Sequence, residues 1–344
     1  MVNVELNCLP TIIGSMPHAD AQSAVSLISH YLRDIPAWPQ LPKRSFLENM
    51  YVQYSEGFPG VVLGDDSLYI DTSQDISRPL EQLYAAYLDN DRDKYPISPD
   101  YAAGLHHFLG QPHLTPRAVK GQITGPLTWG LTVTDKEKRA ILHDDVLSDA
   151  VPKLLKLKAA WMEKELKIIS PNTIIFVDEP YMSAYGASTA SGAFTSTEKI
   201  VAMLDEVFAG ISGAKGLHCC GNTDWSVLLK ASLDILSFDA YNYAESLSLY
   251  PAEIKKFLGK GGTIAWGIVP NDAESLDRES IASLKDRLGE AMAPFTRNGL
   301  PFRQLIAQGL LTPSCGLASL PEETAGRVLE LLADLSAEIR KRYA

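Results

Sequence analysis

Eight short apolar runs, separated by longer amphipathic stretches, constrain the fold of this chain more than any other feature of its sequence. Such runs are typical of buried strands, and the stretches between them have the periodicity of helices. Alternating strands and helices build a parallel sheet, and eight such units favour a closed (β/α)8 TIM barrel of the α/β class. A doubly wound open sheet is the alternative, although no glycine-rich dinucleotide fingerprint follows the first strand. The expected strands are Thr11–Ser15, Ile35–Leu41, Ala118–Gly125, Thr173–Glu179, Lys215–Gly221, Asp234–Ala240, Thr263–Pro270 and Leu310–Gly316.

One long segment departs from this alternation. Residues 36–101 are rich in Pro, Asp and Tyr and show weak periodicity. We expect them to form an insertion near the barrel mouth, with a hairpin at Val61–Ile70 and a short helix at Leu80–Tyr87. No shift in composition requires a second domain, so the prediction is a single barrel over residues 1–344. The long amphipathic helices are expected at Asp145–Ile169, Ser196–Ile211, Ser280–Asn298 and Pro321–Tyr343.

Charge and composition narrow the classes of partner. The net charge of −11 argues against nucleic acid, which is bound through basic surfaces. No apolar stretch is long enough to span a bilayer, and the N-terminal residues lack the cationic and apolar regions of a secretion signal. Four cysteines do not form a disulfide framework in a chain of this size, so we expect reduced thiols and a cytoplasmic location.

Two distant segments carry side chains of the metal-ligand type, His218-Cys219-Cys220 in one and Cys315 in the other. In a strand, His218 and Cys220 would share one face and Cys219 would point away, because side chains alternate. Cys315 would complete a set of one imidazole and two thiolates, which suits zinc. Three protein ligands leave a coordination position open, as in catalytic zinc sites. The alternative is that these cysteines are only buried apolar side chains.

Other polar side chains fall where the expected strands end. In a β/α barrel the active site lies at the carboxyl ends of the strands. Metal-type ligands and carboxylates that converge on this rim are expected of an enzyme. These residues are Ser15, His18, Thr124, Asp178, Glu179, His218, Cys220, Asp239, Asn271, Asp272 and Cys315.

Five motifs occur in a fixed order along the chain: Ile13-Gly14-Ser15-Met16-Pro17, Ile123-Thr124-Gly125-Pro126-Leu127-Thr128, Val177-Asp178-Glu179-Pro180, His218-Cys219-Cys220 and Pro313-Ser314-Cys315-Gly316. In this order the chain resembles the C-terminal catalytic barrel of cobalamin-independent methionine synthase, as a stand-alone core. The motifs extend from the first expected strand to the last, so the resemblance covers essentially the whole chain. The segment Cys220-Gly221-Asn222-Thr223 is also similar to zinc-dependent corrinoid methyltransferases of the same uroporphyrinogen-decarboxylase-like superfamily, which methylate coenzyme M.

The resemblance implies a zinc ion held by His218, Cys220 and Cys315, which would be the catalytic centre. Asp239 stands where the methionine synthases supply a glutamate ligand, and its side chain is shorter. Zinc coordination deprotonates a bound thiol, and the thiolate is the form that attacks a methyl group.

The resemblance also implies a binding site for homocysteine. Asp178 matches the carboxylate that receives the amino group, and Gly14 and Ser15 match the turn that holds the substrate carboxylate. Glu48 is a second candidate partner for the amine. The alternative for Asp178 is a carboxylate that caps the next helix.

Three departures from the family bear on the methyl donor. No counterpart of the large N-terminal barrel of these enzymes is expected, Tyr181–Ala184 lacks their basic-acidic continuation, and Trp266–Asp272 lacks a histidine. Transfer from methyltetrahydrofolate needs a general acid to protonate the leaving nitrogen, whereas cob(I)alamin leaves without a proton. We therefore expect methylcobalamin or a methylated corrinoid protein as the donor, with His18 as the first substitute acid if folate is used.

The sequence thus predicts a zinc-dependent methyltransferase that converts homocysteine to methionine. One alternative is a corrinoid-dependent enzyme that methylates another thiol, such as coenzyme M. The other is a barrel with structural zinc that serves a corrinoid protein without turnover of its own.

Overall fold

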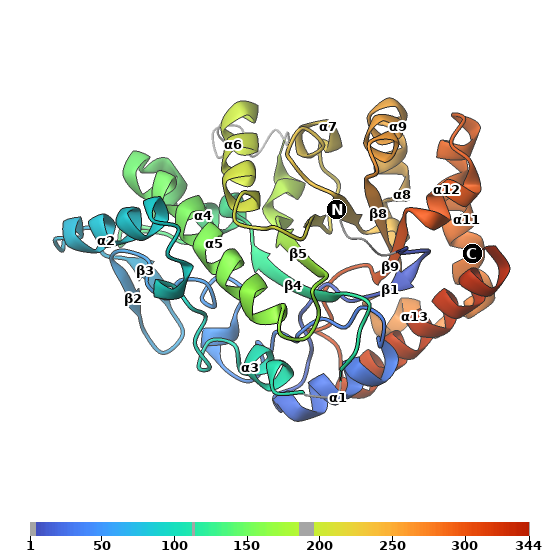
Figure 1. Cartoon of the computed structure of the whole chain (residues 1–344), viewed down its shortest axis with the longest axis horizontal. Helices are drawn as coiled ribbons and strands as arrows, with labels where there is room; N and C mark the ends of the chain where they lie inside the picture. The colour runs from blue at the N-terminus through green and yellow to red at the C-terminus, as the bar shows by residue number, and fades with distance from the viewer. Residues whose placement is uncertain (1–4, 112–113, 186–195, 344) are drawn as a thin grey trace.

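The computed structural model describes residues 5–111, 114–185 and 196–343 (Figure 1). Its main sheet has seven strands in the order β1-β9-β8-β7-β6-β5-β4, and all neighbouring pairs are parallel. The sheet curls, and helices lie along its outer face (Figure 1). The strands are β1 Leu9–Pro10, β4 Val119–Thr124, β5 Thr173–Asp178, β6 Ala214–Cys219, β7 Ile235–Phe238, β8 Thr263–Val269 and β9 Gly309–Pro313.

A short segment, residues 37–40, joins the two edges of this sheet. Ala37 forms a parallel bridge with Lys120 on β4, and Gln40 forms one with Ser15 beyond β1. On the β4 side, the Lys120 amide donates to the carbonyl of Pro36, just before the segment, at 2.9 Å. On the β1 side, the Gln40 amide donates to the Gly14 carbonyl at 3.1 Å. The segment therefore takes the place of the eighth strand, and the predicted TIM-barrel class is confirmed.

The first strand differs from its prediction. The paired strand is Leu9–Pro10 rather than Thr11–Ser15, although the Thr11 amide still donates to β9 at 3.0 Å. Beyond Thr11 the chain leaves β9 and turns toward residues 37–40, where Gly14 and Ser15 find their partners. The expected strand is thus divided between two neighbours.

The four long helices that the sequence predicts are confirmed as α5 Asp145–Leu166, α6 Thr197–Phe208, α11 Ile281–Arg297 and α13 Glu322–Tyr343. Side-chain oxygens of Asp144, Ser196 and Ser280 cap the first turns of α5, α6 and α11. Within the described ranges, no helix combines the length and the apolar character needed to cross a membrane. Apart from α2 (Ser77–Leu88), the other α-helices in the described ranges are α1 Ala21–Tyr31, α3 Ala103–Leu109, α4 Pro126–Thr132, α7 Trp225–Leu228, α8 Ala240–Ser248, α9 Pro251–Gly259, α10 Ala273–Asp277 and α12 Phe302–Ala307.

The long segment before β4 contains the predicted hairpin and helix. The hairpin consists of β2 Val61–Leu63 and β3 Leu68–Ile70, which pair in antiparallel fashion, and the helix is α2 Ser77–Leu88. Both predictions are confirmed.

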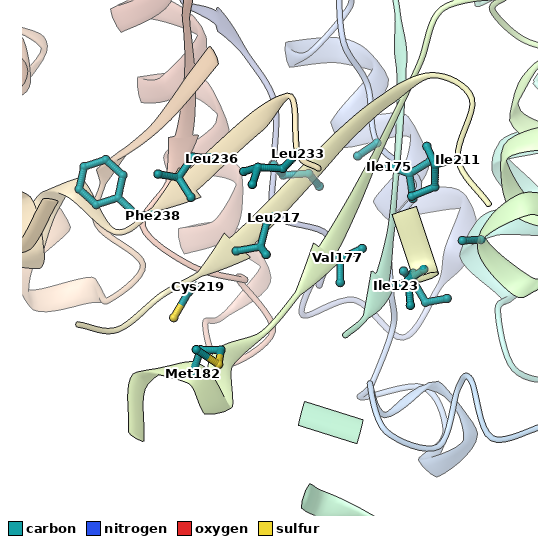
Figure 2. Packing of buried hydrophobic residues seen from close by; sticks show 14 of the residues in the cluster. Ile123, Ile175, Val177, Met182, Ile211, Leu217, Cys219, Leu233, Leu236 and Phe238 are labelled. Carbon is teal, nitrogen blue, oxygen red and sulfur yellow. The ribbon is translucent and has the colours of Figure 1, made fainter. Parts of the chain in front are cut away.

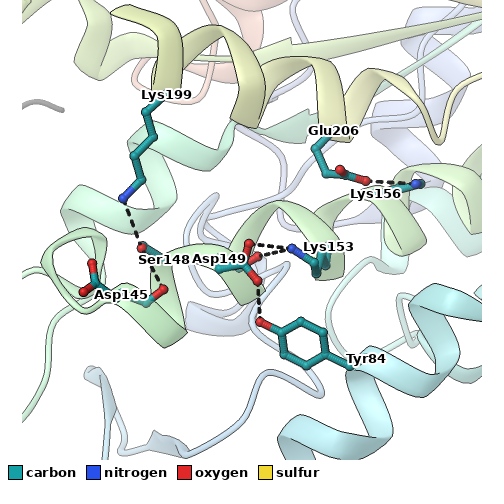
Figure 3. Close-up of polar contacts among 8 residues, drawn as sticks. All are labelled: Tyr84, Asp145, Ser148, Asp149, Lys153, Lys156, Lys199 and Glu206. Carbon is teal, nitrogen blue, oxygen red and sulfur yellow. Dashed lines mark hydrogen bonds and ion pairs between the residues drawn. The ribbon is translucent and has the colours of Figure 1, made fainter. Parts of the chain in front are cut away.

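Polar contacts join α2 and α6 to α5 (Figure 3). The Tyr84 hydroxyl on α2 donates to Asp149 on α5 at 2.5 Å, and Lys153 pairs with the same carboxylate at 2.7 Å. Lys156 on α5 pairs with Glu206 on α6 at 2.9 Å. These contacts fasten α2 and α6 to α5.

The apolar side chains form two layers, one on each face of the curled sheet. The layer between sheet and helices includes Leu217, Cys219, Leu236 and Phe238 (Figure 2). The layer inside the barrel is smaller and consists of Leu6, Leu9, Ile35, Ala118, Ile174, Phe176, Ala214, Ile235, Ala265 and Leu310. The inner layer stops short of the carboxyl ends of the strands, where polar residues take over.

Candidate metal centre

Strand β6 and the chain that follows β9 bring together three side chains suited to binding a metal. His218 is the penultimate residue of β6, Cys220 follows that strand, and Cys315 follows β9. One ligand atom from each residue lies within 4.8 Å of the others. His218 is buried, while Cys220 and Cys315 are partly exposed. One imidazole and two sulfurs at this spacing form a donor set that suits zinc.

A neighbouring strand orients the imidazole. His218 lies opposite Ser237 in the β6–β7 register, and its Nδ1 is 3.0 Å from the Ser237 hydroxyl oxygen. Its Nε2 is buried and has no hydrogen-bond partner among the described residues. A hydrogen bond at one ring nitrogen fixes the tautomer and leaves the other nitrogen as a metal ligand. This buried free nitrogen fits a bound metal.

The two thiols of the cluster shift each other's pKa in opposite directions. A hydrogen bond from Cys315 lowers the pKa of Cys220, and His218 lowers it further against the effect of burial. The same hydrogen bond, together with burial, raises the pKa of Cys315. A thiolate therefore forms readily at Cys220, and the thiolate is the form that binds metals.

Cys219 lies on the opposite face of β6. It is fully buried in the layer between sheet and helices, near Met182 (Figure 2). Burial raises the pKa of its thiol to about 12. The predicted alternation along the strand is confirmed, and Cys219 is the buried apolar cysteine of this motif.

The loop that carries Cys315 is held by Asn271, which follows β8. The Ser314 hydroxyl donates to the Asn271 side-chain oxygen at 2.9 Å, and the Asn271 amide group donates to the Gly316 carbonyl at 3.3 Å. The residues on both sides of Cys315 are thus fixed to one side chain. Such contacts keep a ligand in place.

Asp239 is engaged elsewhere. It caps α8, where one carboxylate oxygen accepts from the Asn242 amide and the other from the Asn242 side chain, each at 2.8 Å. The cluster within 4.8 Å contains the other three predicted ligands and not Asp239. The carboxylate is still close enough to Cys220 and His218 for their charges to influence its pKa, which burial raises.

Asp178 ends β5 beside the cluster of His218, Cys220 and Cys315, and it lies opposite His218 in the register. Its side chain is buried, and its Oδ1 finds no hydrogen-bond partner in the part of the chain that is described. Burial raises the pKa of this carboxyl group, and the nearby His218 and Lys120 oppose that effect. A buried acceptor without a partner is a candidate for a cationic ligand.

Glu179, not Asp178, caps the next helix in space. Its oxygens accept from the backbone amides of Leu127 and Thr128 at 2.9 and 2.8 Å, at the first turn of α4. Gly125 has no room for a β-carbon because the Glu179 side chain occupies that place. This contact joins the Ile123–Thr128 motif to the Val177–Pro180 motif. Asp178 does not take part in it and remains available for a ligand.

Gly14 and Ser15 lie between residues 37–40 and the Cys315 loop. The Gln40 amide donates to the Gly14 carbonyl at 3.1 Å, and the Leu317 amide donates to the Ser15 carbonyl at 2.9 Å. A β-carbon at Gly14 would lie 2.5 Å from the Gln122 side chain, so only glycine fits. The turn is thus built against the same loop that carries a metal-type ligand.

Glu48 and His18 have partners within the chain. Glu48 is fully buried and pairs with Arg44 at 2.8 Å, and it also accepts from the Leu41 amide at 3.3 Å. His18 is buried with its Nε2 3.9 Å from Glu322, and burial lowers its pKa. These contacts hold the loops that follow β1 and residues 37–40.

The sequence interpretation missed Lys120 and Gln122, which lie inside the barrel. Lys120 is fully buried, and its ammonium donates to the Ile13 carbonyl at 2.6 Å and to the Gln122 side chain at 3.2 Å. A lysine and a glutamine at alternate positions of an apolar strand were the available signal, because polar residues on a buried strand face need partners.

Comparison with known proteins gives sequence and fold relatives. No family model matches the chain. Over 224 residues it is 24% identical to a curated methionine synthase of Methanocaldococcus jannaschii, a match that spans 64% of this chain and 65% of that protein.

Solved structures extend the fold similarity to nearly the whole chain. A B12-independent methionine synthase from a Shewanella species, solved with selenomethionine, has a TM-score of 0.60 at 16% identity, covering 98% of this chain and 99% of that one. A methyltransferase from Methanosarcina mazei has a TM-score of 0.55 at 13% identity, covering 97% and 94%. The chain is similar in sequence to a methionine synthase and has the fold of the B12-independent methionine synthases.

Proposed function

We propose that this protein is a zinc-dependent methyltransferase that methylates the thiol of homocysteine to give methionine. The observation that carries the proposal is the cluster of His218, Cys220 and Cys315 beside the unpartnered Asp178 oxygen of the described structure. Similarity to a methionine synthase supports it. The cytoplasm, where thiols stay reduced, is the compartment we propose.

His218 Nε2 and the sulfurs of Cys220 and Cys315 would hold the zinc ion. When bound, zinc would keep the substrate sulfur deprotonated at neutral pH. Asp178 would bind the substrate ammonium, and Gly14 and Ser15 would hold its carboxylate.

Glu48 would be a second partner for the ammonium, in competition with Arg44. In the reaction, the substrate sulfur attacks the methyl carbon, and the bond between that carbon and its donor breaks with both electrons leaving on the donor.

The proposed donor is methylcobalamin, free or on a corrinoid protein. Trp266–Asp272, which comprises the end of β8 and the residues after it, contains no histidine to protonate a leaving nitrogen. A cobalt leaving group needs no proton. The segment 36–101 near the barrel mouth would receive a corrin ring carried by a protein.

The state of the metal site distinguishes this proposal from a structural-zinc barrel that serves a corrinoid protein. X-ray absorption of the zinc-loaded protein should show one light-atom ligand replaced by sulfur when homocysteine is added. A closed structural site would keep the same ligands with and without the thiol, and that result would contradict the proposal.

The choice of thiol depends on Asp178. We expect Asp178→Asn to weaken homocysteine binding by roughly 10- to 100-fold, because a charged hydrogen bond contributes about 1.5–3 kcal/mol. Calorimetric titration of the zinc-loaded protein would measure the change. Coenzyme M has no amine, so its binding should not depend on Asp178. Turnover with coenzyme M that equals or exceeds turnover with homocysteine would favour the alternative substrate.

The loop contacts of Asn271 give a second prediction. We expect Asn271→Ala to weaken zinc binding by about 10- to 100-fold, because it frees the loop that carries Cys315. Competition with a chromogenic chelator would measure the affinity. Asn298→Ala is the matched control, since Asn298 donates to the Pro294 carbonyl at the end of α11. Equal zinc affinity in the two variants would show that the loop does not depend on Asn271.

A further inference from the structure

A buried ammonium group lies inside the barrel, below the candidate metal centre. Lys120 is on β4, and its Nζ is 4.3 Å from the centre of the Phe176 ring, which belongs to the inner apolar layer. Lys120 is fully buried, and desolvation of a charged group is costly unless partners compensate. Its fixed partners are the Ile13 carbonyl and the Gln122 side chain, at 2.6 and 3.2 Å.

Both partners lie next to the Gly14–Ser15 turn, which is proposed to hold the substrate carboxylate. Ile13 immediately precedes Gly14 and Ser15. The Gln122 side chain packs against Gly14, where no β-carbon fits, and donates to the Trp38 carbonyl at 3.1 Å. Lys120 therefore ties β4 to Ile13, and Gln122 ties β4 to Trp38. Both contacts lie where residues 37–40 close the barrel.

The same lysine also bears on Asp178. Lys120, Gln122 and Thr124 alternate along one face of β4, and Thr124 lies opposite Asp178 on β5. The side chains of Lys120 and Asp178 therefore lie on the same face of the sheet, and both are buried.

We propose that Lys120 is a positioning residue that sets the spacing of the amino-acid recognition site, formed by the Gly14–Ser15 turn and Asp178. This inference rests on the proposed function and adds to it. Lys120 makes no contact with the metal ligands among the hydrogen bonds of the described residues. Its contribution should therefore appear in the binding of the amino-acid end of the substrate and not in the binding of zinc.

The test compares Lys120→Met with Lys158→Met. Lys158 is a matched control because it is also fully buried and donates to a backbone carbonyl, that of Pro96 at 2.9 Å, but lies on α5 outside the barrel. We expect Lys120→Met to raise the Kd for homocysteine at least about tenfold, with zinc content unchanged. The Kd for 2-mercaptoethanol, a thiol without amine and carboxylate, should not change. Lys158→Met should leave both constants at the wild-type value.

Three results would overturn the inference: an unchanged homocysteine Kd in Lys120→Met, an equal rise for both thiols, or an equal rise in Lys158→Met. If Lys120→Met does not fold, Gln122→Leu removes one partner of the ammonium, and it should raise the homocysteine Kd in the same selective way. Failure of wild-type, zinc-loaded protein to bind homocysteine would instead refute the proposed function, and this inference with it.

Discussion

Replacement of Cys220 or Cys315 by alanine is expected to remove both zinc and methyl transfer while the barrel stays folded. Each variant leaves only two of the three clustered donors, and zinc sites are built from three or four protein ligands. Loss of the metal removes several kcal/mol of transition-state stabilisation, which lowers the rate of methyl transfer roughly a thousandfold or more. Metal analysis, circular dichroism and a methionine assay on the same preparation would measure the three properties.

Cys219→Ala is the control within the same motif. Its side chain is buried in the layer between sheet and helices, so we expect normal zinc content and activity with a stability loss of about 1 kcal/mol. If Cys219→Ala lost zinc as completely as Cys220→Ala, the assignment of the two faces of β6 would be wrong.

The second large effect concerns the methyl donor. With zinc-loaded protein and homocysteine, we expect methionine from methylcobalamin and at least about 100-fold less from methyltetrahydrofolate, because a missing general acid costs 10²–10⁴ in rate. Each donor is supplied separately, and methionine is quantified. Free methylcobalamin should react slowly compared with a methylated corrinoid protein.

Robust methionine formation from methyltetrahydrofolate alone would contradict the corrinoid proposal. His18 would then be the first residue to test as the proton donor, because its buried Nδ1 has no hydrogen-bond partner in the described ranges. His18→Gln would lose the folate reaction under that interpretation. His30→Gln, which changes an exposed histidine near the end of α1, is the matched control.

The fold could be predicted because most residues of its main-sheet strands are buried. The residues of β5 and β8 are all buried and mostly apolar, so apolar runs marked these strands plainly. The first strand was placed two residues too late because its pairing is divided between β9 and residues 37–40. A division of this kind depends on contacts between distant segments, which local periodicity does not report.

The candidate site could be predicted where strand alternation decides it. Alternation alone separates His218 and Cys220 from Cys219. Strand alternation could not predict that Glu179 caps α4, and it could not predict the contacts of Lys120. Each of these depends on segments that meet only in the folded barrel.

The closure of the barrel has a consequence for the order of folding. Strand β1 pairs with β9, and the Ser336 hydroxyl near the end of the chain donates to the Cys8 carbonyl, 328 residues away. Contacts between such distant segments form slowly because long loops must close first. Cys315 is the second residue after β9, so the three donors meet only when the last strand has docked. Zinc bound to this cluster would therefore stabilise the closed barrel after the last strand has docked. Removal of zinc by a chelator should raise the rate at which β9 separates from the barrel more than it lowers the rate at which β4–β8 fold.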